Sequence, residues 1–332
     1  MKICIVKLSA MGDIIHAMVA LEFIKKKFPH SEIDWIVESG FRGVLENNPY
    51  IDNILPIELK SIKKEKMKIF SQIALVKEYA KNSYDIIIDA QGLIKSAIVA
   101  KLLKTENSTL YGFSKNSIRE GVASWFYDEV VDIAYDENTI DRNATILSQP
   151  LGVEVTPKDI LEKKSFLYFK DSDKKELQKE YNLIVIGSTW ESRNYPKERF
   201  VAVVESLKTH TYIVWGSQEE YEKALWMQEQ SSYLEILPKG NLNTLKAVIA
   251  GAKLLIGNDT GPTHMAWGLN IPSITIFGPT PINRVYVTPI NRVVKSSSEV
   301  NHYKLNKNDF SINEIEPQEI VAIALELLEE KI

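Results

Sequence analysis

Short apolar runs alternate along the chain with longer amphipathic stretches. In the first half, runs typical of strands that are covered on both faces occupy residues 2–7, 33–37, 52–57 and 84–90. Between the first two runs, apolar residues recur at helical spacing, which predicts one helix over residues 13–28. Alternation of strands with helices predicts parallel sheets joined by right-handed crossovers.

This pattern lapses near residues 170–181, which are charged and nearly without large apolar side chains. Strand-like runs then return, at residues 182–187, 211–216, 253–257 and 272–278. We therefore expect an α/β protein of two Rossmann-like domains, residues 1–170 and 171–332, which face each other across a ligand-binding cleft. A last helix is predicted from Pro317, and its apolar stripe is available to pack back on the first domain.

Composition narrows the class of protein. The 332 residues are 45% hydrophobic and 25% charged, as in ordinary globular proteins, and a net charge of −4 argues against nucleic acid as a partner. The single cysteine excludes a disulfide scaffold and fits a reducing compartment. We find neither a membrane-spanning run nor a secretory signal, so we expect a cytoplasmic protein that is free to visit a membrane surface.

The run "IGNDTGPTHMAWG" at residues 256–268 ends an apolar strand with small polar residues and then starts a helix. The first N–H groups of such a helix can bind a phosphate, and Thr260 and Gly261 suit a diphosphate. Alternatively, Asp259 or Thr260 only caps the helix. The sequence "FGPT" after the next strand repeats the device and favours the phosphate interpretation.

Polar residues follow other strands in the same way. In "LSAMGDIIHA", Asp13 is either a first-turn residue that complements the helix dipole or a general base, and neither dinucleotide nor P-loop fingerprint is present. Ser188, Thr189 and Arg193 either contact a diphosphate or belong to an ordinary polar loop. Glu220, with its neighbour Glu219, either accepts from sugar hydroxyls or marks a solvated helix start.

Two further features are less specific. Residues 60–68 hold five lysines and one glutamate, which fit either an exposed face or an acidic substrate. "DAQGLIKSA" places Gln91 and other polar residues at the end of another strand. The five histidines are too scattered for a local metal motif, so we expect no metal cofactor.

With these residues laid out, the chain resembles the lipopolysaccharide heptosyltransferases, which are glycosyltransferases of the GT-B fold. The resemblance covers nearly the whole chain and is carried by "VKLSAMGDIIHA", "WIVESGF", "YDIIIDAQGLIKSA", "LPKGNL", "NDTGPTHMA" and "IFGPTP". "DAQGLIKSA" and the joint presence of MGD and DTG-x-x-H are its specific parts; the other pieces are weaker alone.

The resemblance implies transfer of a heptose from ADP-heptose to the first Kdo sugar of Kdo-lipid A, with inversion and without a metal, by a peripheral enzyme at the cytoplasmic surface of the inner membrane. It implies that Asp13 is the general base and that Arg193 stabilises the leaving ADP. The second domain would hold the donor, through Ser188, Thr189, Arg193, Glu220, Asp259, Thr260, Gly261 and His264. The first domain would hold the acceptor, through Gly12, Asp13, Lys60, Lys63, Lys64, Gln91 and Arg119.

Two departures and three alternatives accompany this interpretation. Arg193 and Tyr195 stand where the family has lysine and tryptophan; arginine keeps the charge with a different geometry. An enzyme that adds the second heptose, a non-catalytic nucleotide-sugar-binding protein and a two-domain nucleotide-sugar epimerase stay open. A cleft aspartate and the lysine run speak against the binding protein, and the lysine run speaks against the epimerase.

Overall fold

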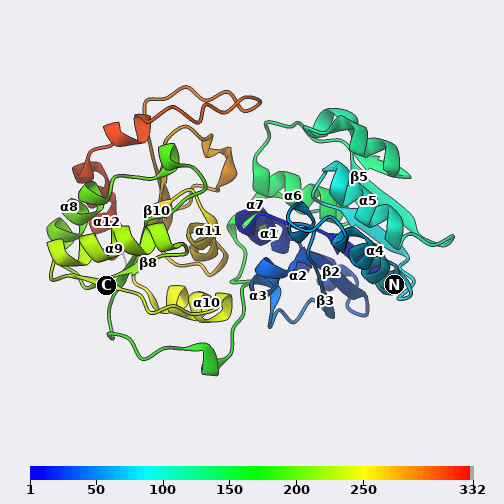
Figure 1. The fold of residues 1–332 in the computed structure, drawn as a ribbon, viewed down its shortest axis with the longest axis horizontal. Coiled ribbons are helices and arrows are strands. Elements are labelled where there is room, and N and C mark those ends of the chain that lie inside the picture. The colour runs from blue at the N-terminus through cyan, green and yellow to red at the C-terminus, as the bar shows by residue number, and fades with distance from the viewer. Residues whose placement is uncertain (330–332) are drawn as a thin grey trace. The chain divides into compact units, whose positions relative to one another are not determined.

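The computed structural model describes residues 1–329 and divides into two compact units, Met1–Tyr168 and a second unit that begins at Phe169 (Figure 1). The division lies beside the boundary expected after residue 170. Each unit is built on one six-stranded parallel sheet. The strands of the first sheet are β1 (Lys2–Val6), β2 (Glu32–Glu38), β3 (Asn53–Ile57), β4 (Ile86–Asp89), β5 (Thr109–Phe113) and β6 (Glu129–Val131). The strands of the second are β7 (Asn182–Val185), β8 (Thr211–Val214), β9 (Leu234–Ile236), β10 (Leu255–Asn258), β11 (Ser273–Phe277) and β12 (Asn291–Lys295).

Both sheets are wound in the same way. The first has the order β3-β2-β1-β4-β5-β6 and the second β12-β11-β10-β7-β8-β9. In each unit the first strand lies beside the fourth, so the direction of winding reverses between β1 and β4 and again between β7 and β10. Loops at the carboxyl ends of such a strand pair separate and leave a crevice, where doubly wound proteins bind ligands.

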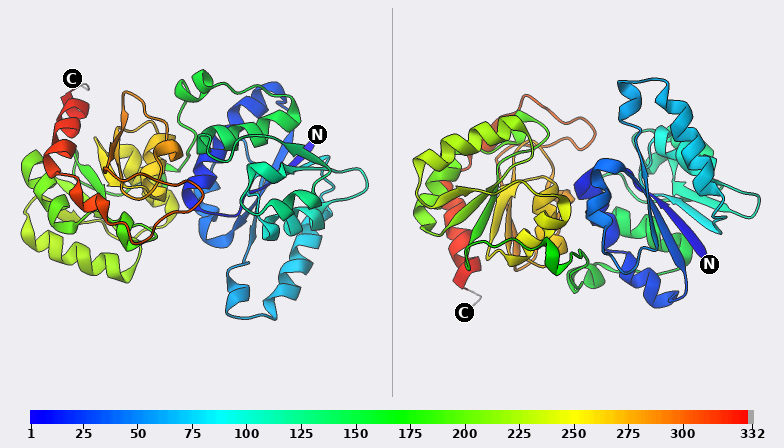
Figure 2. Two further views of the ribbon diagram at one scale, coloured as in Figure 1. Left: turned by 90° about the horizontal axis from the view of Figure 1, so that it is seen from above. Right: turned by 60° about the horizontal axis from the view of Figure 1, so that its bottom comes forward.

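Helices cover both faces of each sheet (Figure 2). In the first unit they are α1 (Met11–Met18), α2 (Leu21–Lys27), α3 (Arg42–Leu45), α4 (Lys68–Ala80), α5 (Ile94–Leu103), α6 (Thr139–Ser148) and α7 (Pro157–Leu161). In the second they are α8 (Lys197–Leu207), α9 (Gln218–Gln230), α10 (Leu242–Gly251), α11 (Gly261–Gly268) and α12 (Pro317–Glu329). Short 3-10 turns that matter below are η2 (Ser61–Lys63), η4 (Gly121–Phe126) and η7 (Glu191–Arg193).

One sequence prediction about helices needs correction. The helix expected over residues 13–28 is interrupted by a turn at Val19 and Ala20, which separates α1 from α2. Both turn residues are buried, so the apolar stripe continues through the break and hides it in the sequence pattern. The last helix, α12, buries Ile320, Ala324 and Leu327 in the core of the second unit and packs on α8. Packing of this helix on the first domain stays a prediction.

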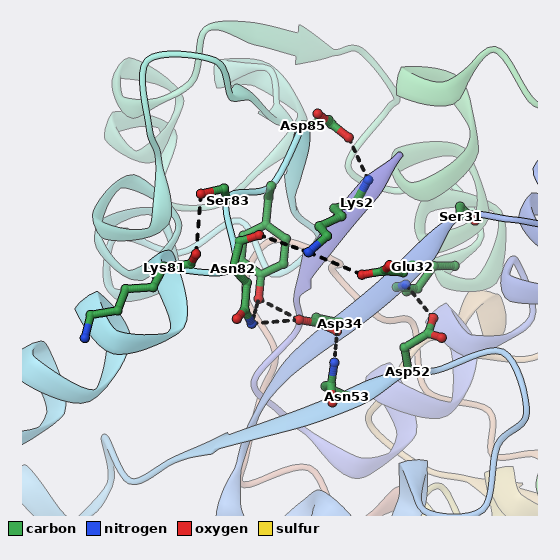
Figure 3. Close-up of polar contacts among 12 residues, drawn as sticks. Lys2, Ser31, Glu32, Asp34, Asp52, Asn53, Lys81, Asn82, Ser83 and Asp85 are labelled. Carbon is green, nitrogen blue, oxygen red and sulfur yellow. Dashed lines mark hydrogen bonds and ion pairs between the residues drawn. The ribbon is translucent and has the colours of Figure 1, made fainter.

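A polar network closes the amino ends of the strands in the first sheet (Figure 3). Asp34, which is 4% exposed, accepts hydrogen bonds from Tyr84 Oη at 2.7 Å, Asn82 Nδ2 at 3.1 Å and Asn53 Nδ2 at 2.8 Å. Burial raises the pKa of the Tyr84 hydroxyl, which therefore stays protonated and donates. This network joins β2 to the first residue of β3 and to the segment before β4, at the end of the sheet opposite to the carboxyl ends of its strands.

Candidate functional site

The structure places the sequence-predicted site residues at the carboxyl ends of the strands in the two sheets. In the second unit they follow β7, β8 and β10; in the first they follow β1, β3, β4 and β5. The loops after β7 and β10, and those after β1 and β4, flank the points where the winding reverses. Two separate candidate sites therefore form, one in each unit, at the positions where doubly wound sheets bind ligands.

Asp259 is the centre of the site in the second unit. Its side chain is 2% exposed, and its carboxylate is surrounded by donors: Arg193 Nη2 lies 2.7 Å from Oδ2, His264 Nε2 lies 3.1 Å from Oδ1 and Thr280 Oγ1 lies 3.2 Å from Oδ2. Arg193 also donates to the backbone carbonyl of Asp259, and Ser188 Oγ approaches the same carbonyl at 3.4 Å. One buried carboxylate thus holds together residues from three loops.

The charges around Asp259 decide its ionisation. Burial alone would raise the pKa of this carboxyl group, but the hydrogen bond from His264 and the positive charges of Arg193 and Arg284 outweigh burial. The pKa is held well below its usual range, so Asp259 is a carboxylate at neutral pH. Arg193 is itself buried, and its guanidinium faces this carboxylate. Its positive charge is therefore largely matched within the protein.

The start of α11 is fixed by its neighbours and not by a side-chain cap. Thr260 occupies the position before the helix in an extended conformation, and its side chain makes no capping hydrogen bond. Asn258, which is fully buried, donates to Ile186 O and accepts from Tyr195 N, both at 2.9 Å, so it ties the end of β10 to the loop after β7. Thr260 thus stands at the N-cap position without a side-chain hydrogen bond to the helix, and its half-buried hydroxyl lies at the start of α11.

Two cationic side chains lie against the ring of Trp190, in the loop after β7. The Arg193 guanidinium lies 5.3 Å from the centre of the Trp190 ring, and Lys307 Nζ lies 4.9 Å from it. Lys307 comes from the long segment between β12 and α12 and is exposed. Thr189, next to Trp190, is exposed as well. The loop after β7 therefore presents the Thr189 hydroxyl, and the segment before α12 adds the exposed Lys307 over Trp190, near the buried Arg193–Asp259 pair.

Glu220 lies where β7 and β8 end. Its Oε2 accepts the backbone N–H of Gly216 at 2.6 Å, and a Cβ placed on Gly187 would meet its Oε1 at 2.0 Å. Gly187 is thus needed for the carboxylate to lie against the backbone. Its neighbour Glu219 is exposed and pairs with Lys223 at 3.1 Å. The two glutamates are adjacent in the sequence but differ in environment: Glu219 is a solvated helix residue, and Glu220 faces the site.

In the first unit, Asp13 lies in the first turn of α1, beside Gly12. Its Oδ2 accepts the backbone N–H of Ala10 at 3.1 Å, as expected for a residue that complements a helix start. Gln91, from the loop after β4, accepts the backbone N–H groups of Leu8 and Ser9 through Oε1 at 3.1 and 3.0 Å. Gln91 therefore holds the loop that carries Asp13.

The loop of Gln91 is itself anchored by Asp89, which sequence reasoning missed. This fully buried carboxylate accepts the N–H of Gln91 at 2.9 Å and the hydroxyls of Ser96 and Tyr127 at 2.9 and 2.8 Å. Burial raises the pKa of Asp89, and the hydrogen bonds oppose the rise. Gly92, with φ of +68°, lets the chain turn back over it.

Lys7 is a second missed residue of this site. It is 5% exposed, and its Nζ donates to the carbonyl of Ala90 at 2.7 Å, which joins the loop after β1 to the loop after β4. Burial lowers the pKa of Lys7, while the carboxylates of Asp13 and Asp89 favour its charged form. The sequence signal was a lysine at the end of an apolar strand, where a charged residue needs a partner.

The basic residues expected at the acceptor lie on loops after β3 and β5. Lys60 Nζ lies 4.5 Å from the centre of the Phe41 ring, and its backbone N–H donates to Glu38 Oε1 at 3.1 Å. Lys64 and Arg119 are exposed. The side chain of Lys63 lies outside the described part of the structure. Within residues 1–329, no group of three or more His, Cys, Asp and Glu side chains is placed to hold a metal ion.

Comparison with known proteins gives a consistent family. The sequence model of glycosyltransferase family 9 (heptosyltransferase) matches residues 72–314. Lipopolysaccharide heptosyltransferase 1 of Campylobacter coli is 37% identical over 98% of this chain and 99% of its own length. The protein of the same name from Escherichia coli K12 is 30% identical over 84% of this chain and 88% of its own length. Among solved structures, E. coli heptosyltransferase WaaC with ADP superposes with a TM-score of 0.77 at 25% identity, over 99% of this chain and all of the other. The fold class expected from the sequence, two Rossmann-like α/β domains of the GT-B class, is confirmed.

Proposed function

This chain belongs to glycosyltransferase family 9, the heptosyltransferases, and from that premise we propose that it transfers L-glycero-D-manno-heptose from ADP-heptose to the first Kdo of Kdo-lipid A. The proposal is supported by relatives named heptosyltransferase 1 that match along most of the chain. The proposed product belongs to the inner core of lipopolysaccharide.

We assign the donor to the second unit. ADP carries its charge on the diphosphate, and the start of α11 offers backbone N–H groups beside Thr260 and Gly261. Ser188 and Thr189 add hydroxyls from the neighbouring loop, and Glu220 is the carboxylate for the ribose hydroxyls. Asp259 and His264 are positioning residues in this proposal, because the buried carboxylate fixes both loops.

We assign the acceptor to the first unit, to Gly12 and Asp13 at the start of α1 and to Gln91, which holds the loop before that helix. One carboxylate oxygen of Asp13 is occupied by the Ala10 N–H, and the other is the proposed proton acceptor. The exposed cations Lys60, Lys64 and Arg119 suit the carboxylates and phosphates of Kdo-lipid A. Lys63 is assigned with them from its place in the sequence.

The proposed reaction is a single displacement. Asp13 takes the proton of the acceptor hydroxyl, whose oxygen forms a bond to the anomeric carbon of the heptose. The bond from that carbon to the diphosphate breaks, its electron pair leaves with ADP, and the anomeric configuration inverts. Negative charge that grows on the diphosphate is met by the start of α11 and by the cations beside Trp190.

Arg193 occupies the place of the lysine that the family resemblance assigns to the leaving ADP. The Arg193 guanidinium forms an ion pair with Asp259. We therefore propose that Arg193 acts partly by positioning the Asp259 carboxylate, and that Lys307 supplies additional positive charge for the diphosphate. With these cations available we propose a metal-independent reaction. Unchanged turnover in EDTA is the expected result, and loss that Mg²⁺ restores would contradict it.

Transfer of the first heptose is favoured over transfer of the second. The heptosyltransferase 1 of C. coli is 37% identical to this chain, whereas the E. coli heptosyltransferase II structure is 18% identical and supports the fold alone. Mass spectrometry of products from ADP-heptose separates the two: we expect one heptose added to Kdo-lipid A. Addition only to an acceptor that already carries heptose would assign the second step, and donor binding without a product would assign a binding protein.

We further propose that the enzyme works at the cytoplasmic surface of the inner membrane, because its proposed acceptor is a lipid. None of the helices within residues 1–329 is long and apolar enough to cross a membrane. Contact with the bilayer would therefore have to be made by an exposed surface.

A further inference from the structure

The segment between β3 and the middle of α4 stands out from the body of the first unit (Figure 2, light blue). It contains η2 and the first turns of α4. Two large apolar side chains at its end are mostly solvent-exposed: Met67 is 76% exposed and Phe70 is 66% exposed. Single exposed apolar residues are ordinary, but two such residues one helical turn apart on a projecting segment are not.

The rest of α4 shows that this exposure is local. Val76, further along the helix, is 1% exposed, and it joins the core beneath the helix together with Leu75 and Tyr79. The helix thus packs through its second half, while its first turn carries apolar side chains beyond the core. Met67 and Phe70 would stabilise the chain more if they were buried, so their exposure points to an apolar partner outside the unit.

The charge around these residues identifies the partner. Residues 60–68 contain five lysines and one glutamate, although the whole chain has a net charge of −4. Lys64 and Lys66 are exposed, and Glu65 is engaged by Lys68 at 3.5 Å. Apolar side chains surrounded by lysines fit an anionic lipid surface, where rings and thioethers enter the interface and ammonium groups remain at the headgroups.

A second exposed apolar group lies on the same layer of the first unit. The 3-10 turn η4 carries Trp125, which is 75% exposed, and packs on α5, which in turn packs on α4. Ile94 and Ile98 of α5 are 40% and 43% exposed. Tryptophan is enriched at membrane interfaces because its ring is apolar and its N–H is polar. The layer of α4, α5 and η4 therefore presents more than one side chain suited to lipid.

We infer that the surface formed by Lys64, Lys66, Met67 and Phe70 docks the enzyme on an anionic phospholipid bilayer. The role of this docking rests on the proposed function, since docking would bring the loop after β3, with Lys60, to the membrane that holds the acceptor. It can be tested without the transfer reaction. The docking surface and the proposed proton acceptor, Asp13, are on different loops of the unit.

Binding to vesicles is the direct test, measured by co-sedimentation of the full chain. We expect binding to vesicles of phosphatidylglycerol mixed with phosphatidylcholine, and much weaker binding to phosphatidylcholine alone. The double variant Met67→Ser, Phe70→Ser should lose at least about tenfold in partition coefficient. Lys66→Gln should lose about fivefold at low salt and less at high salt, because salt screens the attraction.

Matched controls separate docking from general loss of apolar surface. Leu161 and Val287 are 52% and 56% exposed and lie outside this surface, so a Leu161→Ser, Val287→Ser variant should bind vesicles like the wild type. Thermal unfolding of the double variant should match the wild type, since neither side chain is buried. Transfer to a detergent-dispersed acceptor should also persist in the double variant, which separates failure of docking from failure of the proposed reaction.

Three outcomes would overturn the inference. The wild type could fail to bind anionic vesicles, or the double variant could bind them as the wild type does. The surface could also belong to an interface between copies of this chain: sedimentation velocity would then show an assembly that Met67→Ser, Phe70→Ser dissociates, with vesicle binding unchanged.

Discussion

Replacing Arg193 by methionine tests whether the buried ion pair organises the donor site. The substitution removes the guanidinium 2.7 Å from the Asp259 carboxylate and leaves an apolar chain of similar length. Within the described part of the chain, His264 and Thr280 then remain as side-chain donors to Asp259, which is 2% exposed. Breaking a buried pair costs about 3–5 kcal/mol; because two donors remain, we expect the lower end, about 3 kcal/mol in free energy of unfolding.

A double-mutant cycle isolates the pair. Asp259→Asn removes the negative charge but keeps an oxygen that can accept a hydrogen bond, so we expect a smaller cost, about 2 kcal/mol. In the double variant Arg193→Met, Asp259→Asn, neither charge is left unmatched, and the two losses should fall short of additivity by about 2 kcal/mol. Urea unfolding followed by tryptophan fluorescence suits the measurement, because Trp190, Trp215, Trp226 and Trp267 report on the second unit.

The same pair predicts a pH dependence. The pKa of Asp259 is lower in the folded chain than in the unfolded chain, so its stabilisation is complete above the unfolded pKa of about 4 and is lost as the pH falls toward the folded value. The advantage of the wild type over Asp259→Asn should therefore shrink between pH 5 and pH 3, roughly the range set by the unfolded pKa. Additive losses together with a difference that is independent of pH would refute this account.

Three further predictions concern ligands. Glu220→Gln and Gly187→Ala should each weaken ADP binding about tenfold in isothermal titration, because the alanine would place a Cβ 2.0 Å from the Glu220 carboxylate. Gly40→Ala is the control: it has open space at its Cβ and should leave ADP binding unchanged. Equal effects of all three substitutions would contradict the assignment. Lys307→Met should weaken binding of ADP by roughly threefold without affecting adenosine, and Lys304→Met is its control; an equal loss for adenosine would exclude contact with the diphosphate. Changing Lys60, Lys63 and Lys64 together to glutamine should raise the KM for Kdo-lipid A most at low salt; an unchanged KM would leave these lysines as a solvated face.

The fold could be predicted from the sequence where strands are buried on both faces. The runs that include β1, β2, β4 and β7 are almost wholly apolar, and their alternation with helices requires parallel sheets. The short strands β6 and β9 could not be predicted. Each has three residues, of which two are exposed in β6 and one in β9, so the apolar pattern is too short to detect.

The roles of the candidate site residues stay predictions. Their places could be predicted from the sequence, because polar side chains stand where apolar strands end. Their individual environments could not. Glu219 and Glu220 are adjacent and chemically alike, and their contacts in the fold distinguish them: Glu219 pairs with Lys223, and Glu220 lies against Gly187. Lys307 is far along the chain from Trp190, and no local pattern relates a lysine in a polar segment to that ring. Asp89 reads as the last residue of a strand, and its role as an anchor depends on Tyr127 from another segment.

Single-turnover transfer by Asp13→Asn tests the central claim most directly. Asparagine keeps an oxygen that can accept the Ala10 N–H, so the start of α1 should be preserved, but it cannot take a proton from the acceptor. We expect the rate of heptose transfer to fall by about 10²–10⁴-fold, the range for loss of a general base. The Kd for ADP should stay within about twofold of the wild-type value, since only the general base is lost. Transfer at the wild-type rate would show that Asp13 only supports the helix and that the proposed mechanism is wrong.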